Sequence, residues 1–209
     1  MLHQALVAQP QTVETYTQLF NLYFAFGVAA GVIVIGLMVY LAIRYRAKSG
    51  HNPSAHPVPG WKVALITALI SASILITAEY NTFASESNIT IPSNPNAIHI
   101  HVTAFQWGWN FTYPNGKATL NNLTVPAGAI IILNVTSRDV FHSFGIPMLA
   151  EKIDAIPGRI NTMWFQAPFQ TGVYKDAIRC YELCGAGHAL MVANLTVVSQ
   201  QNWQRWISS

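Results

Sequence analysis

The chain has 209 residues, of which 52% are hydrophobic and only 9% are charged. Soluble domains average about 25% charged residues, so this composition excludes an ordinary soluble protein and predicts a membrane protein. Four basic residues between positions 44 and 62 account for most of the net charge of +3, and the remaining charges are sparse and nearly balanced. Because the chain has no basic patch and no Gly-rich phosphate loop, we expect no nucleic-acid partner.

Two apolar segments predict a transmembrane helical hairpin. Residues 19–43 carry no charge over 25 residues, which is long enough to cross a bilayer. The second segment, residues 61–80, has an uncharged part of only 16 residues. Trp61 and Tyr80 can lie at the two membrane interfaces while Lys62 extends toward water, which completes the span. Two buried helices of a soluble core are the alternative, but nothing else in the chain would cover so much apolar surface.

The connector at residues 44–60 sets the expected orientation. Together with Lys62 it contains four basic residues and no acidic residue. Positive charge favours the cytoplasmic side, so both termini should lie outside, with an N-terminal segment at residues 1–18 and a C-terminal domain at residues 85–209. Because the first 18 residues lack a basic n-region, the first span is expected to be an anchor and not a cleaved signal peptide.

The exterior domain is predicted to be all-β. Pro-Asn-Gly, Pro-Ala-Gly and Pro-Gly turn signals separate several short β-rich runs, and this pattern is typical of a sandwich or barrel. The predicted strands lie at residues 97–103, 106–113, 130–135, 162–165 and 191–198.

Metal-binding side chains gather in the sequence CYELCGAGHALM, at residues 180–191. This run contains both cysteines of the chain, a histidine and a methionine, and His142 lies about forty residues upstream. Thiolate, imidazole and thioether groups bind soft or borderline transition metals. Two thiolates, two imidazoles and a thioether exceed what one tetrahedral ion needs, so the set is predicted to hold two metals that share the sulfurs. This stoichiometry indicates a binuclear copper electron-transfer centre.

Two other interpretations of the cysteines remain at this point. Cys180 and Cys184 could form a small-loop disulfide, although the joint spacing with His188 and Met191 favours a metal site. Structural zinc sites usually show a second matching cysteine or histidine pair, and none is present. Glu182, which lies between the cysteines, could support a second ion.

The chain resembles subunit II of the haem–copper terminal oxidases, in the cytochrome c oxidase branch that carries the copper A centre. Four motifs carry the resemblance: FQWGWNF at 105–111, SRDVFHSFGIP at 137–147, KIDAIPGRIN at 152–161 and CYELCGAGHALM at 180–191. The resemblance implies a two-helix transmembrane hairpin followed by an all-β, cupredoxin-like Greek-key sandwich. It also implies the plasma membrane of a prokaryote as the location.

The resemblance further implies roles for individual residues. The two copper ions would be bound by His142, Cys180, Cys184, His188, Met191 and the backbone carbonyl of Glu182. The carboxylate of Glu182 would help to bind a magnesium or manganese ion shared with subunit I. Trp107 would receive electrons from the donor. Asp139, Asp154 and Arg159 would support the ligands or form the subunit interface.

The implied function is electron input, without catalysis by this chain alone. Electrons from an external donor, a cytochrome c or a blue copper protein, would pass through the copper centre to haem in subunit I, where oxygen is reduced to water. Further membrane subunits are expected. The alternative is a membrane-anchored copper carrier or oxidase assembly factor, which would not need Trp107 or the interface motifs. One departure from the family is clear, because residues 80–209 hold only six acidic residues and lack a strong acidic docking patch.

Overall fold

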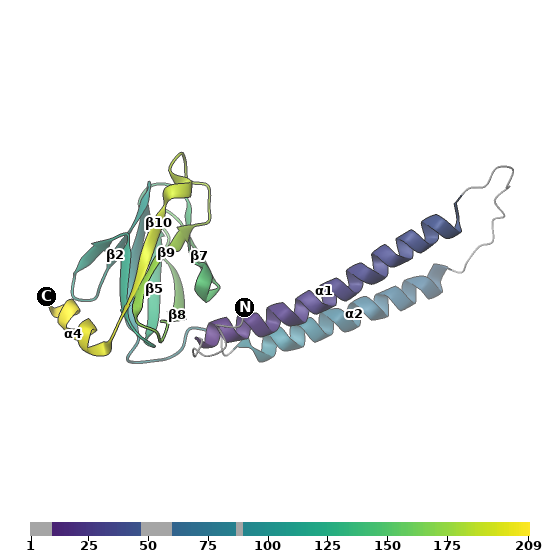
Figure 1. Ribbon diagram of the computed structural model, residues 1–209, viewed down its shortest axis with the longest axis horizontal. Helices are drawn as coiled ribbons and strands as arrows, with labels where there is room; N and C mark the ends of the chain where they lie inside the picture. The colour runs from purple at the N-terminus through teal and green to yellow at the C-terminus, as the bar shows by residue number, and fades with distance from the viewer. Residues whose placement is uncertain (1–9, 47–59, 87–89) are drawn as a thin grey trace. The chain divides into compact units, whose positions relative to one another are not determined.

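A computed structural model describes residues 10–46, 60–86 and 90–209 of the chain. The chain divides into two units, one of which consists of most of a pair of helices and the other of which contains the β-domain, whose described residues begin at residue 90. The helical unit consists of α1 (Gln11–Arg44) and α2 (Gly60–Ala84), which run antiparallel and side by side (Figure 1). The hydroxyl group of Tyr23 in α1 donates a hydrogen bond to the carbonyl of Ala78 at 3.1 Å and lies 2.7 Å from the hydroxyl of Thr82, which joins the two helices.

Both helices are long and apolar enough to cross a membrane. Each contains an apolar window of 18 residues with a mean hydropathy of 2.5 in α1 and 1.8 in α2, and the apolar side chains are exposed along the helices instead of being buried against protein. Helices that are apolar all round are typical of membrane spans. The prediction of two apolar helices is therefore confirmed.

The helices extend beyond the predicted apolar spans. Helix α1 begins eight residues before residue 19, and α2 ends four residues after residue 80. At the end of α2, polar side chains bond to carbonyls one turn earlier: Asn81 donates to Thr77 at 2.7 Å, and Ser85 donates to Asn81 at 2.9 Å. The helix can therefore continue into a polar region. Most of the predicted connector, residues 47–59, lies outside the described residues.

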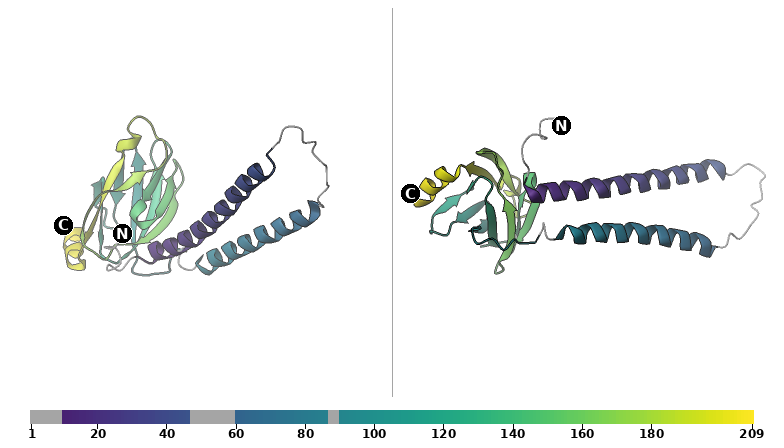
Figure 2. Two further views of the ribbon diagram at one scale, coloured as in Figure 1. Left: turned by 45° about the vertical axis from the view of Figure 1, so that its right-hand side comes forward. Right: turned by 90° about the horizontal axis from the view of Figure 1, so that it is seen from below.

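The β-domain is a sandwich of two five-stranded sheets (Figures 1 and 2). One sheet has the strand order β3-β2-β1-β5-β8, and the other has the order β4-β10-β9-β6-β7. The pairs β1–β5 and β4–β10 are parallel, and the remaining neighbours are antiparallel. The strands are β1 (Ile98–Phe105), β2 (Gly108–Thr112), β3 (Ala118–Leu120), β4 (Asn122–Pro126), β5 (Ile130–Ser137), β6 (His142–Ile146), β7 (Glu151–Ala155), β8 (Asn161–Gln166), β9 (Gly172–Cys180) and β10 (Val192–Val198).

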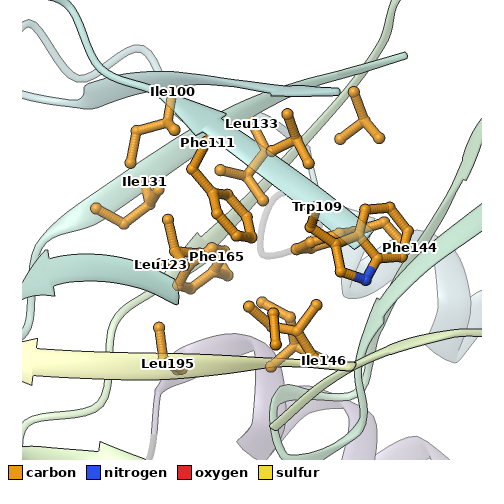
Figure 3. Close-up of a cluster of buried hydrophobic side chains, with 14 of the residues drawn as sticks. Ile100, Trp109, Phe111, Leu123, Ile131, Leu133, Phe144, Ile146, Phe165 and Leu195 are labelled. Atoms are coloured by element: carbon orange, nitrogen blue, oxygen red, sulfur yellow. The ribbon is translucent and has the colours of Figure 1, made fainter. Parts of the chain in front are cut away.

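The core lies between the two sheets and consists mainly of inward-facing residues of every strand except β3 (Figure 3). In β5, Ile131, Leu133 and Val135 alternate with more exposed residues, as the period of two in a strand requires. Burial of each such side chain stabilises the fold by roughly 1.5–3 kcal/mol. Trp109 packs edge-to-face on Phe144, with ring centroids 5.1 Å apart, at the end of the core that adjoins the cysteine loop.

The sequence prediction of the β-domain needs two corrections. All five predicted strands are present, as β1, β2, β5, β8 and β10, but the other five strands, β3, β4, β6, β7 and β9, were not predicted. In β9 the charged residues are exposed and the burial does not alternate. The domain is also not purely β. Its chain ends in a helix, α4 (Gln200–Ser208), whose first turn is capped by the hydroxyl of Ser199. Trp203 and Trp206 of this helix pack against Tyr113, with ring centroids 5.9 and 4.9 Å away, and close one end of the sandwich.

Glu151 on the edge strand β7 pairs with the buried Ile146. Among the described residues its carboxylate has no hydrogen-bond or ion-pair partner. Burial raises the pKa of this carboxyl group to about 7, well above its ordinary value of 4.5. The folded state therefore favours the protonated form of Glu151. Ionisation of this carboxyl group destabilises the folded state, and the destabilisation begins as the pH rises above the unfolded pKa and reaches its full size above the folded pKa.

We expect Glu151→Gln to stabilise the protein at pH 8 and to have little effect at pH 4, where the carboxyl group is protonated in both states. After allowance for partial exposure, the gain at pH 8 should be about 1–2 kcal/mol. Denaturant unfolding of the purified chain in detergent at the two pH values measures the difference. Glu86→Gln, at an exposed glutamate, is the control and should show no such dependence. Equal stabilisation at both pH values would contradict the burial argument.

Candidate metal centre

His142 is placed by the turn between β5 and β6. The hydroxyl of Ser137, at the end of β5, lies 3.2 Å from Asp139 and donates to the carbonyl of Val140. Strand β6 then begins with His142, whose side chain is fully buried. Its Nε2 atom lies 2.9 Å from the carboxylate of Asp139, so Nδ1 is directed toward the cysteines. The edge of Trp109 packs against the same imidazole ring, with centroids 6.3 Å apart.

The loop between β9 and β10 carries the remaining candidate ligands. The N–H of Cys180 donates to the carbonyl of Met191, which joins the two ends of the loop, and the N–H of Tyr181 donates to the carbonyl of Ser143, which ties the start of the loop to β6. Within the loop, a short 3-10 helix, η2 (His188–Leu190), turns the chain back toward β10. It stands at the opposite end of the sandwich from α4 (Figure 1).

The donor atoms of the loop and of His142 form one cluster, which is buried at His142 and both cysteines and half-buried at His188. The Sγ atoms of Cys180 and Cys184 lie 3.8 Å apart, and the two cysteines are free, which sets the disulfide interpretation aside. Each sulfur has its own imidazole: Nδ1 of His142 lies 3.8 Å from Cys180, and Nδ1 of His188 lies 3.6 Å from Cys184.

Each sulfur also has a weaker donor beside it. The thioether of Met191 lies 3.8 Å from the Sγ atom of Cys184, and the carbonyl oxygen of Glu182 lies 3.3 Å from that of Cys180. The cluster is therefore two similar sets of donors, one on each side of a pair of sulfurs. Zinc would not need this duplication, since structural zinc sites use four ligands.

The electrostatics of the cluster favour a bound cation. Burial, together with the hydrogen bond and charge of Cys180, raises the pKa of the Cys184 thiol to about 12. Two thiolates this close repel each other, so both cysteines can be deprotonated together only when a metal ion offsets their charge. Beside them, partial burial alone would raise the pKa of the Asp139 carboxyl group, but hydrogen bonds from His142, Gln106 and Val140 lower it to about 2. Asp139 is therefore ionised at neutral pH and fixes the orientation of the His142 ring.

The other residues singled out in the sequence lie outside the cluster. The carboxylate of Glu182 has no hydrogen bond or ion pair with another described residue. Asp154 lies on β7 opposite Ser143, and its backbone carbonyl accepts a hydrogen bond from Asn161 at 2.7 Å. Arg159 is exposed in the following turn. None of the three contacts the sulfurs through its side chain.

Trp107 lies directly against the cysteine loop. Its indole is 43% exposed, and Nε1 donates to the carbonyl of Cys184 at 3.2 Å. Sequence reasoning did not identify Gln106, whose side-chain amide donates to the same carbonyl at 2.7 Å and whose backbone N–H donates to Asp139 at 2.6 Å. Its position directly before the tryptophan was the only available signal.

Comparison with known proteins identifies the family. Residues 116–198 match the family model described as "Cytochrome C oxidase subunit II, periplasmic domain". The heme-copper oxidase subunit 2 of Aeropyrum pernix is 36% identical over 210 residues, a match that covers 92% of this chain and 88% of that protein. The chain belongs to the subunit II family of the haem–copper oxidases. This membership implies copper as the metal, and it favours the oxidase subunit over a copper carrier or assembly factor.

Two further relatives agree with this assignment. The probable cytochrome c oxidase subunit 2 of Rickettsia conorii is 31% identical over 90% of this chain, which spans 65% of that longer protein. The crystal structure of the periplasmic domain of cytochrome oxidase subunit II from Bradyrhizobium japonicum superposes with a TM-score of 0.52 at 34% identity. That match covers 57% of this chain and 95% of the crystallised domain. The cupredoxin-like sandwich and the family are thus confirmed together.

Proposed function

We propose that this subunit II holds a copper A centre of two ions and passes single electrons from an external donor to the catalytic subunit. The observation that carries the proposal is the symmetric donor set, in which each of two neighbouring sulfurs has its own imidazole and its own weaker donor. The proposed ligands are His142, Cys180, Cys184, His188, Met191 and the backbone carbonyl of Glu182. When bound, the two coppers would supply a one-electron redox couple.

The protein's contribution is to hold these ligands still. Core packing fixes the ring of His142, and backbone hydrogen bonds from Cys180 and Tyr181 fix the base of the loop. A ligand set held on rigid strands needs little rearrangement when the charge of the site changes by one electron. Trp107 is the proposed point of electron input, because it is both exposed to a donor and hydrogen-bonded to a cysteine of the site.

The remaining features of the proposal concern the complex. Helices α1 and α2 would span the plasma membrane of a prokaryote, with both termini and the β-domain outside. Subunit I would contain the haems and reduce oxygen, while this chain alone would catalyse nothing. The carboxylate of Glu182, which is unpaired among the described residues, would help to bind a magnesium or manganese ion shared with subunit I. Asp154 and the exposed Arg159 would contribute to the same interface.

The decisive test is an optical and EPR spectrum of the copper-loaded protein, with metal analysis of the same sample. We expect two coppers per chain and a mixed-valence signal in which one unpaired electron is shared by two copper nuclei. A signal from a single copper nucleus would overturn the binuclear assignment. The same spectrum would exclude zinc, which is silent in both measurements.

Met191 is expected to tune the redox potential more than to retain the metal. Its thioether is a weak ligand, and Leu has nearly the same volume, so Met191→Leu should keep both coppers with a core perturbation below about 1.5 kcal/mol. The midpoint potential should change and electron transfer should slow. Potentiometric titration with metal analysis measures both effects. Complete loss of copper would show that the loop is not rigid enough to hold the metal with the remaining ligands.

A further inference from the structure

The position of Trp107 depends on two glycines of the cysteine loop. A Cβ atom added at Gly187 would lie 2.6 Å from Cγ and 2.8 Å from Cε3 of the indole. A Cβ atom added at Gly185 would lie 3.3 Å from Cζ2 of the same ring. Real Cβ atoms essentially never approach other atoms more closely than 3.0 Å. The indole therefore lies across the backbone of the loop, in space that any side chain at residue 187 would occupy.

The backbone does not require glycine at residue 187. Its dihedral angles are φ −89° and ψ 8°, which other residues also adopt. Gly185 differs, since its φ of +113° favours glycine whatever lies nearby. The absence of a side chain at Gly187 is therefore explained by the indole that lies on it.

Hydrogen bonds hold the rest of this segment in place. The backbone N–H of Gln106 donates to Asp139, and the Gln106 side chain donates to the carbonyl of Cys184. The backbone that carries Trp107 is thus fixed on two sides. A side chain at residue 187 would have to be accommodated by rotation of the indole away from the loop, which would break the hydrogen bond from Nε1 to Cys184.

We propose that Gly187 is a positioning residue for electron input, because it keeps the indole of Trp107 in contact with the ligand loop. The inference rests on the proposed function, in which Trp107 receives the electron. Electron tunnelling weakens steeply with the distance between donor and acceptor. A residue larger than glycine at this position should therefore slow electron input, although Gly187 itself has no ligand side chain.

The test compares Gly187→Ala with the wild-type chain in two measurements. In the copper-free chain with 15N-labelled tryptophan, hydrogen exchange of the Trp107 indole N–H is followed by NMR, and its signal is assigned through Trp107→Phe. We expect exchange to become at least about tenfold faster as the hydrogen bond opens. In the purified, copper-loaded oxidase complex, reduction by cytochrome c, used as a probe of a protein donor, should slow by about tenfold or more. Copper content and the copper spectrum should not change.

Two further variants separate positioning from general damage to the loop. Ala186→Ser changes the exposed neighbour and should leave both measurements at wild-type values. In a Trp107→Phe background, Gly187→Ala should slow reduction by less than it does beside tryptophan, because the smaller ring leaves room for the methyl group.

The possible results separate a failure of the proposal for Gly187 from a failure of the proposed function. Unchanged indole exchange and unchanged reduction in Gly187→Ala would overturn the role of Gly187 while the wild-type two-copper spectrum still stood. Loss of copper from Gly187→Ala would also overturn it, since Gly187 would then be needed by the ligand loop itself. Absence of a two-copper signal from the wild-type protein would instead refute the proposed function.

Discussion

Replacement of Cys184 by serine is expected to abolish the two-copper spectrum. The Sγ atom of Cys184 lies within 3.8 Å of donor atoms of Cys180, His188 and Met191. A serine hydroxyl is a hard, neutral ligand and cannot replace a thiolate that bridges two soft metal ions. Metal analysis should therefore give at most one copper per chain, and EPR should show a signal from a single nucleus or none.

The matched control lies in the same loop. Ala186→Ser introduces the same hydroxyl two residues away at an exposed position, and it should keep both coppers and the mixed-valence signal. A normal binuclear spectrum in Cys184→Ser would refute the proposal that this sulfur bridges the metals. Circular dichroism of both variants checks that the β-domain remains folded.

Replacement of Trp107 by alanine is expected to slow reduction by a protein donor by about 10–100-fold while the copper spectrum remains intact. The spectrum should survive because Gln106 still donates to the carbonyl of Cys184 at 2.7 Å after the indole is removed. Stopped-flow reduction of the oxidase complex measures the rate. The control is Val173→Ala, which shortens an exposed apolar side chain elsewhere in the domain, on β9, and should have no effect.

The same experiment should show little dependence on salt. Residues 80–209 contain six acidic and seven basic residues, too evenly balanced for a strong patch of one sign. Association that is steered by electrostatic attraction becomes slower as added salt shortens the Debye length, to about 10 Å near 0.1 M. Docking through apolar contacts around Trp107 does not depend on such steering. We expect the reduction rate to change less than about twofold over this range. A steep loss of rate would indicate that a partner subunit supplies an acidic docking surface.

The sequence was most informative where the pattern is local. Uninterrupted apolar runs predicted both helices, β-rich runs predicted five of the ten strands, and the spacing from Cys180 to Met191 predicted the loop that gathers the candidate ligands. Strand β9 was not predicted because its residues Lys175, Asp176 and Arg179 are solvated and its register is set by pairing with β10. The terminal helix α4 was missed because its stability comes from Tyr113, which lies about ninety residues earlier.

The arrangement around the ligands was also beyond sequence reasoning. The contacts of Gln106 with Asp139 and Cys184 join segments separated by 33 and 78 residues. The reason for a glycine at residue 187 becomes visible only when the indole is placed beside it. The raised pKa of Glu151 could not be predicted from the sequence for the same reason, because it results from burial in the folded chain and not from the residues next to it in sequence.

The pairing of β6 with β9 has a consequence for the order of assembly. Phe144 pairs with Cys180, which lies 36 positions later in the chain, and this pairing is what brings His142 to the sulfurs. Non-local pairings form late because the loop entropy must be overcome before any contact is gained. A nascent or partly folded chain therefore carries the contiguous loop from Cys180 to Met191 but lacks one imidazole. We expect such a chain to retain metal weakly, so that full copper affinity appears only once the second sheet has closed.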